Sequence, residues 1–154
     1  MFRTFLLLLL AFAGSILIGT ALTSVVSTQL NLASIQSMGL PVSFGVRAQT
    51  TWADLLGIFP MLAMVLTVSF LLGFAVAGLL VRLTSASPFV LYPLAGATSF
   101  VVFIFVVYWQ LGGVPIETAS RWGGRLILAL CSAVAGWFFA YATTRWIQSP
   151  GEPA

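Results

Sequence analysis

Four long apolar stretches run through this chain of 154 residues, separated by segments in which polar residues, prolines and glycines gather. A helix needs about 20 apolar residues to cross a hydrocarbon layer about 30 Å thick. Each of the four stretches meets this requirement. The predicted spans cover residues 5–26, 52–81, 89–111 and 126–146. The pattern therefore predicts an all-α integral membrane protein, with the whole chain, 1–154, forming one four-span membrane domain.

The segments between the spans predict how the helices are connected. Residues 82–88 are too few for anything but a hairpin, so we expect four transmembrane helices in an antiparallel bundle. Residues 40–47 alternate apolar with other side chains, which predicts an extended outer loop between the first two spans. Before the last span, glycine pairs bracket residues 114–122, where Glu117 and Arg121 lie one helical turn apart. This spacing predicts a short interfacial helix.

The first apolar stretch has two interpretations. Arg3, the leucines that follow it, and the small residues Ala11 and Ala13 resemble a secretory signal with its cleavage site. Against this, the apolar run continues well past that position to Val26. We therefore expect an uncleaved membrane anchor.

Composition supports the membrane assignment and excludes one class of partner. Hydrophobic residues make up 60% of the chain and charged residues only 6%, with a mean hydropathy of +1.12. An ordinary soluble domain is about a quarter charged. The net charge of +3 comes from arginines scattered between the spans, without the basic patch that nucleic acid requires. We therefore expect no nucleic-acid partner.

The centres of the four spans offer little for catalysis. They hold no charged residue and the chain has no histidine, although buried ionisable groups usually mark substrate paths or proton relays in membranes. Cys131 is the single cysteine, so it has no partner for a disulfide or a thiolate metal cluster. We expect a protein that is not an enzyme and that holds no cofactor or metal.

Arginine positions leave the orientation weakly determined. If the N-terminus faces the cytoplasm, three arginines lie inside and three lie outside: Arg3, Arg82 and Arg145, and Arg47, Arg121 and Arg125. The usual excess of cytoplasmic cations is therefore missing. Because Arg3 adjoins the first span, we expect both termini in the cytoplasm and place the chain in a bacterial inner membrane.

Small side chains recur at every fourth position in two of the spans. Such stripes let helix backbones approach closely where lipid supplies no hydrophobic drive. The predicted packing residues are Ala11, Ser15, Gly19 and Thr23 in the first span, and Ser132, Gly136 and Ala140 in the last. Packing within the chain's own bundle and docking to other subunits are both compatible with this spacing.

The predicted outer side collects most of the charged and indole side chains. This outer cluster consists of Arg47, Trp52, Asp54, Glu117, Arg121, Trp122 and Arg125. Solvated span ends with weak ion pairs are one interpretation. The other is a docking surface for a partner's ectodomain, a lipid headgroup or a quinone head.

Three functional hypotheses follow from this pattern. The first is a non-catalytic accessory subunit of a larger membrane complex, with membrane lipids and other membrane protein subunits as partners. The second is a small homo-oligomeric channel or transporter, because the equal division of arginines is what dual-topology insertion would require. The third is a lipid-binding or quinone-binding protein.

Overall fold

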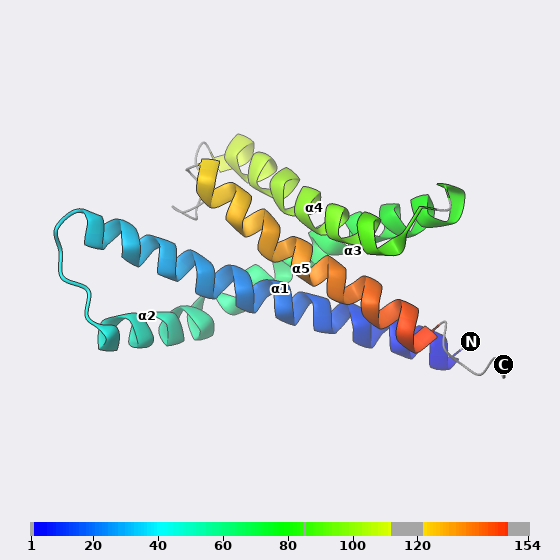
Figure 1. Cartoon of the computed structure of the whole chain (residues 1–154), viewed down its shortest axis with the longest axis horizontal. Helices are drawn as coiled ribbons and strands as arrows, with labels where there is room; N and C mark the ends of the chain where they lie inside the picture. Colours follow the sequence, from blue (N-terminus) through cyan, green and yellow to red (C-terminus); the bar gives the residue numbers. More distant parts are fainter. Residues whose placement is uncertain (1, 85, 112–121, 148–154) are drawn as a thin grey trace.

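The computed structural model describes residues 2–84, 86–111 and 122–147, and within these ranges it contains five helices and no strand. Four of the helices are long and apolar enough to cross a membrane, namely α1, α3, α4 and α5 (Figure 1). The prediction of an all-helical chain with four apolar spans is confirmed at this level. The helices are α1 (Phe2–Ser37), α2 (Phe44–Gly57), α3 (Phe59–Thr84), α4 (Pro88–Leu111) and α5 (Trp122–Ile147).

The first helix is much longer than the predicted span 5–26. α1 has 36 residues, which corresponds to about 54 Å at about 1.5 Å per residue. A hydrocarbon layer is only about 30 Å thick, so α1 reaches well beyond one. The helix ends where Gly39 takes a positive φ of 87°, a conformation that glycine adopts without strain.

The expected extended segment over residues 40–47 is wrong from Phe44 onward, because α2 begins there. Ser43 caps the helix by accepting a hydrogen bond from the backbone N–H of Val46. A short alternation fits a strand, but the next residues carry polar side chains at helical spacing, at Arg47, Thr51 and Asp54. The helical spacing extends over more residues than the alternation does, and the segment from Phe44 is a helix.

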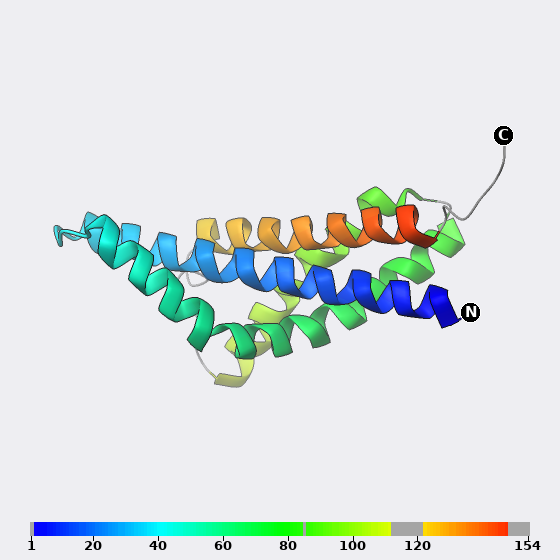
Figure 2. The same ribbon diagram turned by 90° about the horizontal axis from the view of Figure 1, so that it is seen from below.

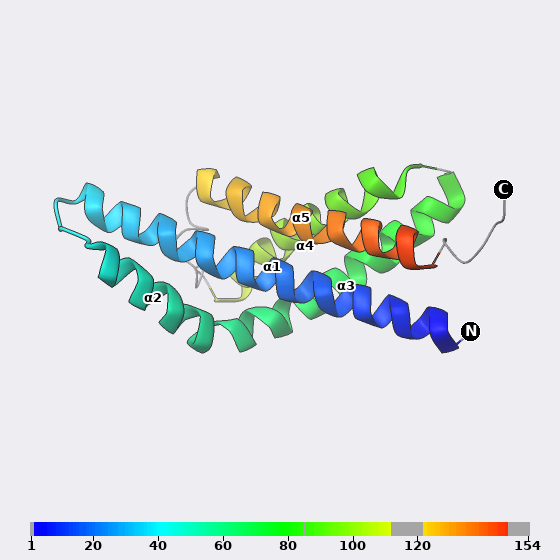
Figure 3. The same ribbon diagram turned by 60° about the horizontal axis from the view of Figure 1, so that its bottom comes forward.

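The second predicted span, 52–81, is divided into two helices. α2 ends at Gly57 and α3 begins at Phe59, with Pro60 in its first turn. Proline lacks a backbone N–H and is tolerated at the start of a helix, where that donor would be unsatisfied anyway. After the turn at residues 38–43, α2 folds back along the distal part of α1, forming a helical hairpin at one end of the molecule (Figures 2 and 3).

The long helices run alternately in opposite directions. α5 packs against both α1 and α4, and α3 packs against α4 and α1 (Figures 1 and 3). Arg3 at the start of α1 and Arg145 near the end of α5 line one small pocket, so these two helix ends lie together. We call this the arginine end and the opposite one, formed by α1 and α2, the hairpin end. Of the predicted interfacial helix 114–122, residues 114–121 lie outside the described part of the chain, and Trp122 begins α5.

An aromatic cluster joins the four long helices in the interior. Phe74 of α3 stacks on Phe139 of α5, with ring centroids 4.6 Å apart, and on Phe70 at 5.0 Å. Phe12 of α1 and Tyr92 of α4 approach the Phe74 ring edge-on, at 6.3 and 5.7 Å. Edge-on and offset pairs are the favourable aromatic geometries. One side chain therefore contacts residues from all four candidate spans.

Candidate functional site

The small-residue stripe of α1 is covered by the chain's own helices. A Cβ added at Gly19 would lie 3.1 Å from the ring of Phe70 and 3.2 Å from the Cβ of Ala135. A Cβ at Gly14 would lie 2.7 Å from the ring of Phe138. α1 therefore fits closely against α3 and α5 on this face. The four predicted positions of this stripe, Ala11, Ser15, Gly19 and Thr23, are all buried.

The stripe of α5 brings two backbones together. A Cβ added at Gly136 would lie 2.7 Å from the carbonyl carbon of Tyr92 and 3.0 Å from the Cα of Pro93. In return, a Cβ added at Gly96 of α4 would lie 3.1 Å from the carbonyl carbon of Ser132. α4 and α5 thus interlock through one glycine each. The predicted packing residues Ser132, Gly136 and Ala140 are buried here and offer no surface to another subunit.

Two members of the outer cluster are bound to polar side chains of α1. The guanidinium of Arg47 donates to Gln29 Oε1 at 2.9 Å and to Gln36 Oε1 at 2.7 Å. The hydroxyl of Thr28 lies 2.6 Å from Asp54 Oδ2, a length typical of charge-assisted hydrogen bonds. Both charged residues therefore hold the hairpin together.

The remaining described members of the cluster lie elsewhere. Trp52 is exposed on a different face of α2 from Arg47. On α5 the guanidinium carbon of Arg125 lies 5.0 Å from the ring centroid of Trp122, in a cation–π arrangement. The structure therefore divides the cluster between α2, which packs on α1 and α3, and the start of α5. Glu117 and Arg121 lie outside the described residues.

Buried hydroxyl groups follow α1 toward the hairpin end. Thr20, Ser24 and Thr28 are spaced one turn apart, and all are buried. The Oγ atoms of Thr20, Thr23 and Ser24 have no hydrogen-bond partner within the described residues, nor does that of Ser132 on α5. The Thr28 hydroxyl lies between Ser24 O, at 2.9 Å, and the Asp54 carboxylate. An unsatisfied buried hydroxyl costs about 1–3 kcal/mol, which makes this row energetically unusual.

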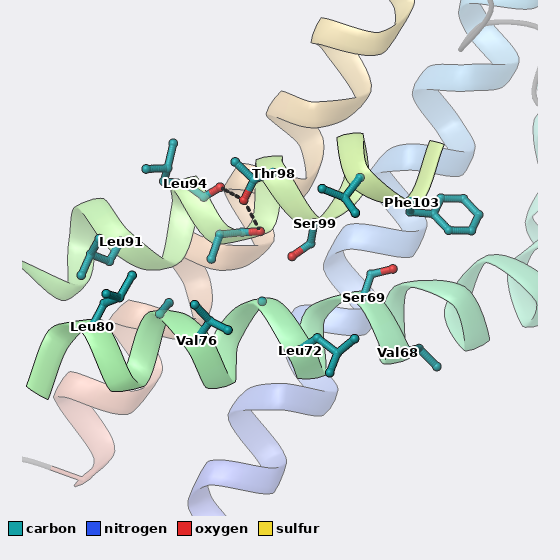
Figure 4. A pocket seen from close by; sticks show the side chains of 14 residues that line it. Val68, Ser69, Leu72, Val76, Leu80, Leu91, Leu94, Thr98, Ser99 and Phe103 are labelled. Carbon is teal, nitrogen blue, oxygen red and sulfur yellow. Dashed lines mark hydrogen bonds between the residues drawn. The ribbon is translucent and has the colours of Figure 1, made fainter. Parts of the chain in front are cut away.

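An apolar groove of about 550 Å³ lies between α3 and α4 (Figure 4). Its base carries small residues, and a Cβ added at Gly73 would lie only 3.3 Å from the Cβ of Ser99. Exposed aliphatic side chains, including Leu72 and Leu94, form its rim. The side chains of Ser69 and Ser99 face the space between the two helices (Figure 4). The small-residue stripes of α1 and α5 are buried, whereas Ser69, Gly73 and Ser99 at the base of this groove are partly exposed.

Sequence reasoning did not single out the groove, because its residues are contributed by two helices at unrelated positions. The signal that could have indicated it is the four-residue spacing of Ser69, Gly73 and Ala77 in the second apolar stretch. No group of His, Cys, Asp or Glu side chains able to hold a metal ion is found among the described residues.

Comparisons with models of known protein families, with curated proteins and with solved structures found no match for this chain. The fold defines its class as an α-helical protein with four candidate membrane spans.

Proposed function

We propose that this protein is a non-catalytic accessory subunit of a larger membrane complex, and that its α3–α4 groove receives an apolar transmembrane helix of a partner subunit. The observation that supports this proposal is the open groove with its small-residue base. In the proposed setting the chain is a four-helix antiparallel bundle in a bacterial inner membrane, with both termini in the cytoplasm.

Helix association in lipid depends on close packing, because lipid tails are as apolar as the helices themselves. Small residues permit such packing, and in the groove Gly73 and Ala95 lie close together, since a Cβ at Gly73 would be 3.2 Å from Ala95 O. Thr98 adds a residue that is exposed at the groove, and its hydroxyl donates a hydrogen bond to Leu94 O at 2.8 Å (Figure 4). We therefore expect a partner helix with small residues of its own to pack between the aliphatic rims.

Filling the groove should release the partner without unfolding the subunit. In mild detergent the wild-type protein should co-purify with a stoichiometric foreign subunit, identified by mass spectrometry. Thr98→Trp places an indole in the groove, and overpacking of about 1–3 kcal/mol corresponds to a loss of affinity of about 5-fold to 150-fold. The melting temperature of the variant should stay close to that of the wild type, because Thr98 is exposed.

Leu130→Trp is the matched control, since Leu130 is exposed on α5 and does not line the groove. This variant should retain the partner. If the wild-type protein purifies without any foreign subunit, or if Thr98→Trp retains the partner as well as Leu130→Trp does, the proposal is wrong.

A small channel or transporter is the second candidate, and the row of buried hydroxyls on α1 favours it. Unpartnered hydroxyls at Thr20, Thr23 and Ser24 lead along one helix to Thr28 and the carboxylate of Asp54. Polar groups inside a membrane protein are costly, and they often mark the path of an ion or proton. In this proposal the row would exchange hydrogen bonds with water or a cation that passes along the helix.

Liposome flux distinguishes the second candidate from the first. If α1 carries a path, the purified protein should raise proton or cation flux above that of empty liposomes, and Thr20→Val should lower the flux. Thr67→Val on α3 is the control, because its hydroxyl is already bonded to Ala63 O at 2.6 Å. Flux equal to that of empty liposomes would exclude the channel and leave the accessory role.

A further inference from the structure

A second cavity lies at the arginine end of the molecule, on the face of α3 opposite to the groove. Its volume is about 630 Å³, within the range of about 300–1,000 Å³ that is typical of ligand pockets. All four long helices line it, and the exposed residues Leu9 of α1 and Leu79 of α3 form part of its lipid-facing rim. We call this cavity the crevice.

One face of α3 contributes three features to the crevice, one at each successive helical turn. They are an aromatic base, an open wall and a cation. Phe74, Gly78 and Arg82 follow one another at four-residue spacing, over about 12 Å of helix. Phe74 and Phe139 form a stacked aromatic base. A Cβ added at Gly78 would lie 3.2 Å from the hydroxyl oxygen of Tyr92, so glycine keeps this part of the crevice open beside the hydroxyl.

The mouth of the crevice is positively charged. Arg82 is exposed in the last turn of α3, and Pro88 beside it begins α4, whose N-terminus carries the positive end of the helix dipole. Asp54 is the one acidic residue in the described part of the chain, and it is held at the hairpin end by Thr28. Among the described residues, Arg82 therefore has no carboxylate to neutralise it.

We propose that the crevice binds one anionic phospholipid, with an acyl chain against the aromatic base and the phosphate at Arg82 and the Tyr92 hydroxyl. The apolar walls match an acyl chain, and the cation at the mouth matches a headgroup with net negative charge. Basic pockets between transmembrane helices are typical sites for such headgroups. This site is separate from the α3–α4 groove and does not depend on the proposed accessory role.

Native mass spectrometry of the full-length protein tests the proposal. The protein is released from detergent containing equal amounts of dioleoyl phosphatidylglycerol and dioleoyl phosphatidylcholine, which differ only in the headgroup. One phosphatidylglycerol should be retained in preference to phosphatidylcholine. Arg82→Gln should reduce this preference by about fivefold, the factor expected for one arginine near an anionic lipid.

Arg145→Gln is the matched control for charge. Arg145 lies at the same end of the molecule but lines a different pocket, with Arg3 and Trp146. Its substitution removes the same charge and should leave the preference unchanged. An equal loss in both variants would show a general surface effect and overturn the assignment to the crevice.

A second pair of variants tests the acyl chain. Ala75 is exposed and lines the crevice, so Ala75→Phe should fill it and reduce the retention of both lipids without lowering the melting temperature. Met64→Phe, at an exposed position of α3 outside the crevice, should change nothing. Normal retention in Ala75→Phe would exclude the crevice as the lipid site.

Displacement of phosphatidylglycerol by excess inorganic phosphate would identify a site for free phosphate instead and overturn the lipid proposal.

Discussion

Replacing Gly136 by leucine should prevent the chain from reaching its folded state. The added Cβ would lie 2.7 Å from the carbonyl carbon of Tyr92, and backbone cannot move aside as a flexible side chain can. Overpacking against side chains costs about 1–3 kcal/mol, and we expect the cost here to exceed that range. The measurement is the melting temperature in detergent, together with the fraction of protein that elutes as one species in gel filtration.

Gly123→Leu is the matched control for this substitution. Gly123 lies in the same helix, and a Cβ added there meets no atom of the described residues within 4 Å. Cys131→Ala, near Gly136 on α5, should also have little effect because the cysteine has no disulfide partner. Gly19→Leu should fall between these limits, since its neighbours are side chains of Phe70 and Ala135. A stable, monodisperse Gly136→Leu protein would show that α4 and α5 do not meet at this position.

Truncating Phe74 to alanine should produce the second large effect. Its ring stacks on Phe70 and Phe139 and meets the edges of Phe12 and Tyr92. Each aromatic pair contributes about 0.5–1.5 kcal/mol, and deleting a buried phenylalanine costs about 3–5 kcal/mol in soluble proteins. Lipid weakens the transfer part of that cost but leaves the loss of packing intact. We therefore expect a loss of about 2–4 kcal/mol in the free energy of unfolding.

Unfolding with a strong detergent measures this change, with Phe44→Ala as the control. Phe44 is exposed at the start of α2 and makes no contact with the aromatic cluster, so its truncation should leave stability unchanged. Equal stability of Phe74→Ala and Phe44→Ala would contradict the central role assigned to the cluster.

Apolar length alone was sufficient to predict the four candidate spans, but not where the first one ends or where the second one begins. The segment after Val26 resembles a loop because it is rich in Ser, Thr and Gln. In the structure these side chains make a polar helix face, whose Gln29 and Gln36 hydrogen-bond to Arg47. Neither the end of α1 nor the start of α2 could be assigned by itself, because the side chains of each satisfy the polar groups of the other.

The packing stripes were visible in the sequence, whereas their partners were not. Four-residue spacing marks Gly136 as a position of close approach. Nothing in that spacing indicates that the opposing surface is the backbone at Tyr92. The crevice could not be predicted for the same reason. Phe74, Gly78 and Arg82 share a face of α3, but Tyr92 and Phe139 reach the crevice from other helices. Spacing within one helix is encoded locally, and the pairing of helices is a property of the whole fold.

The packing of α1 against α5 has a consequence for biosynthesis. Gly14 and Gly19 of the first helix are covered by Phe138 and Ala135 of the last. The helix that is translated first therefore packs directly against the helix that is translated last. While the intervening helices are being made, this face of α1 lacks the side chains of α5 that cover it in the folded protein. Closure of the fold therefore waits for the insertion of α5, and the nascent protein passes through a stage in which its first helix lacks its main neighbour.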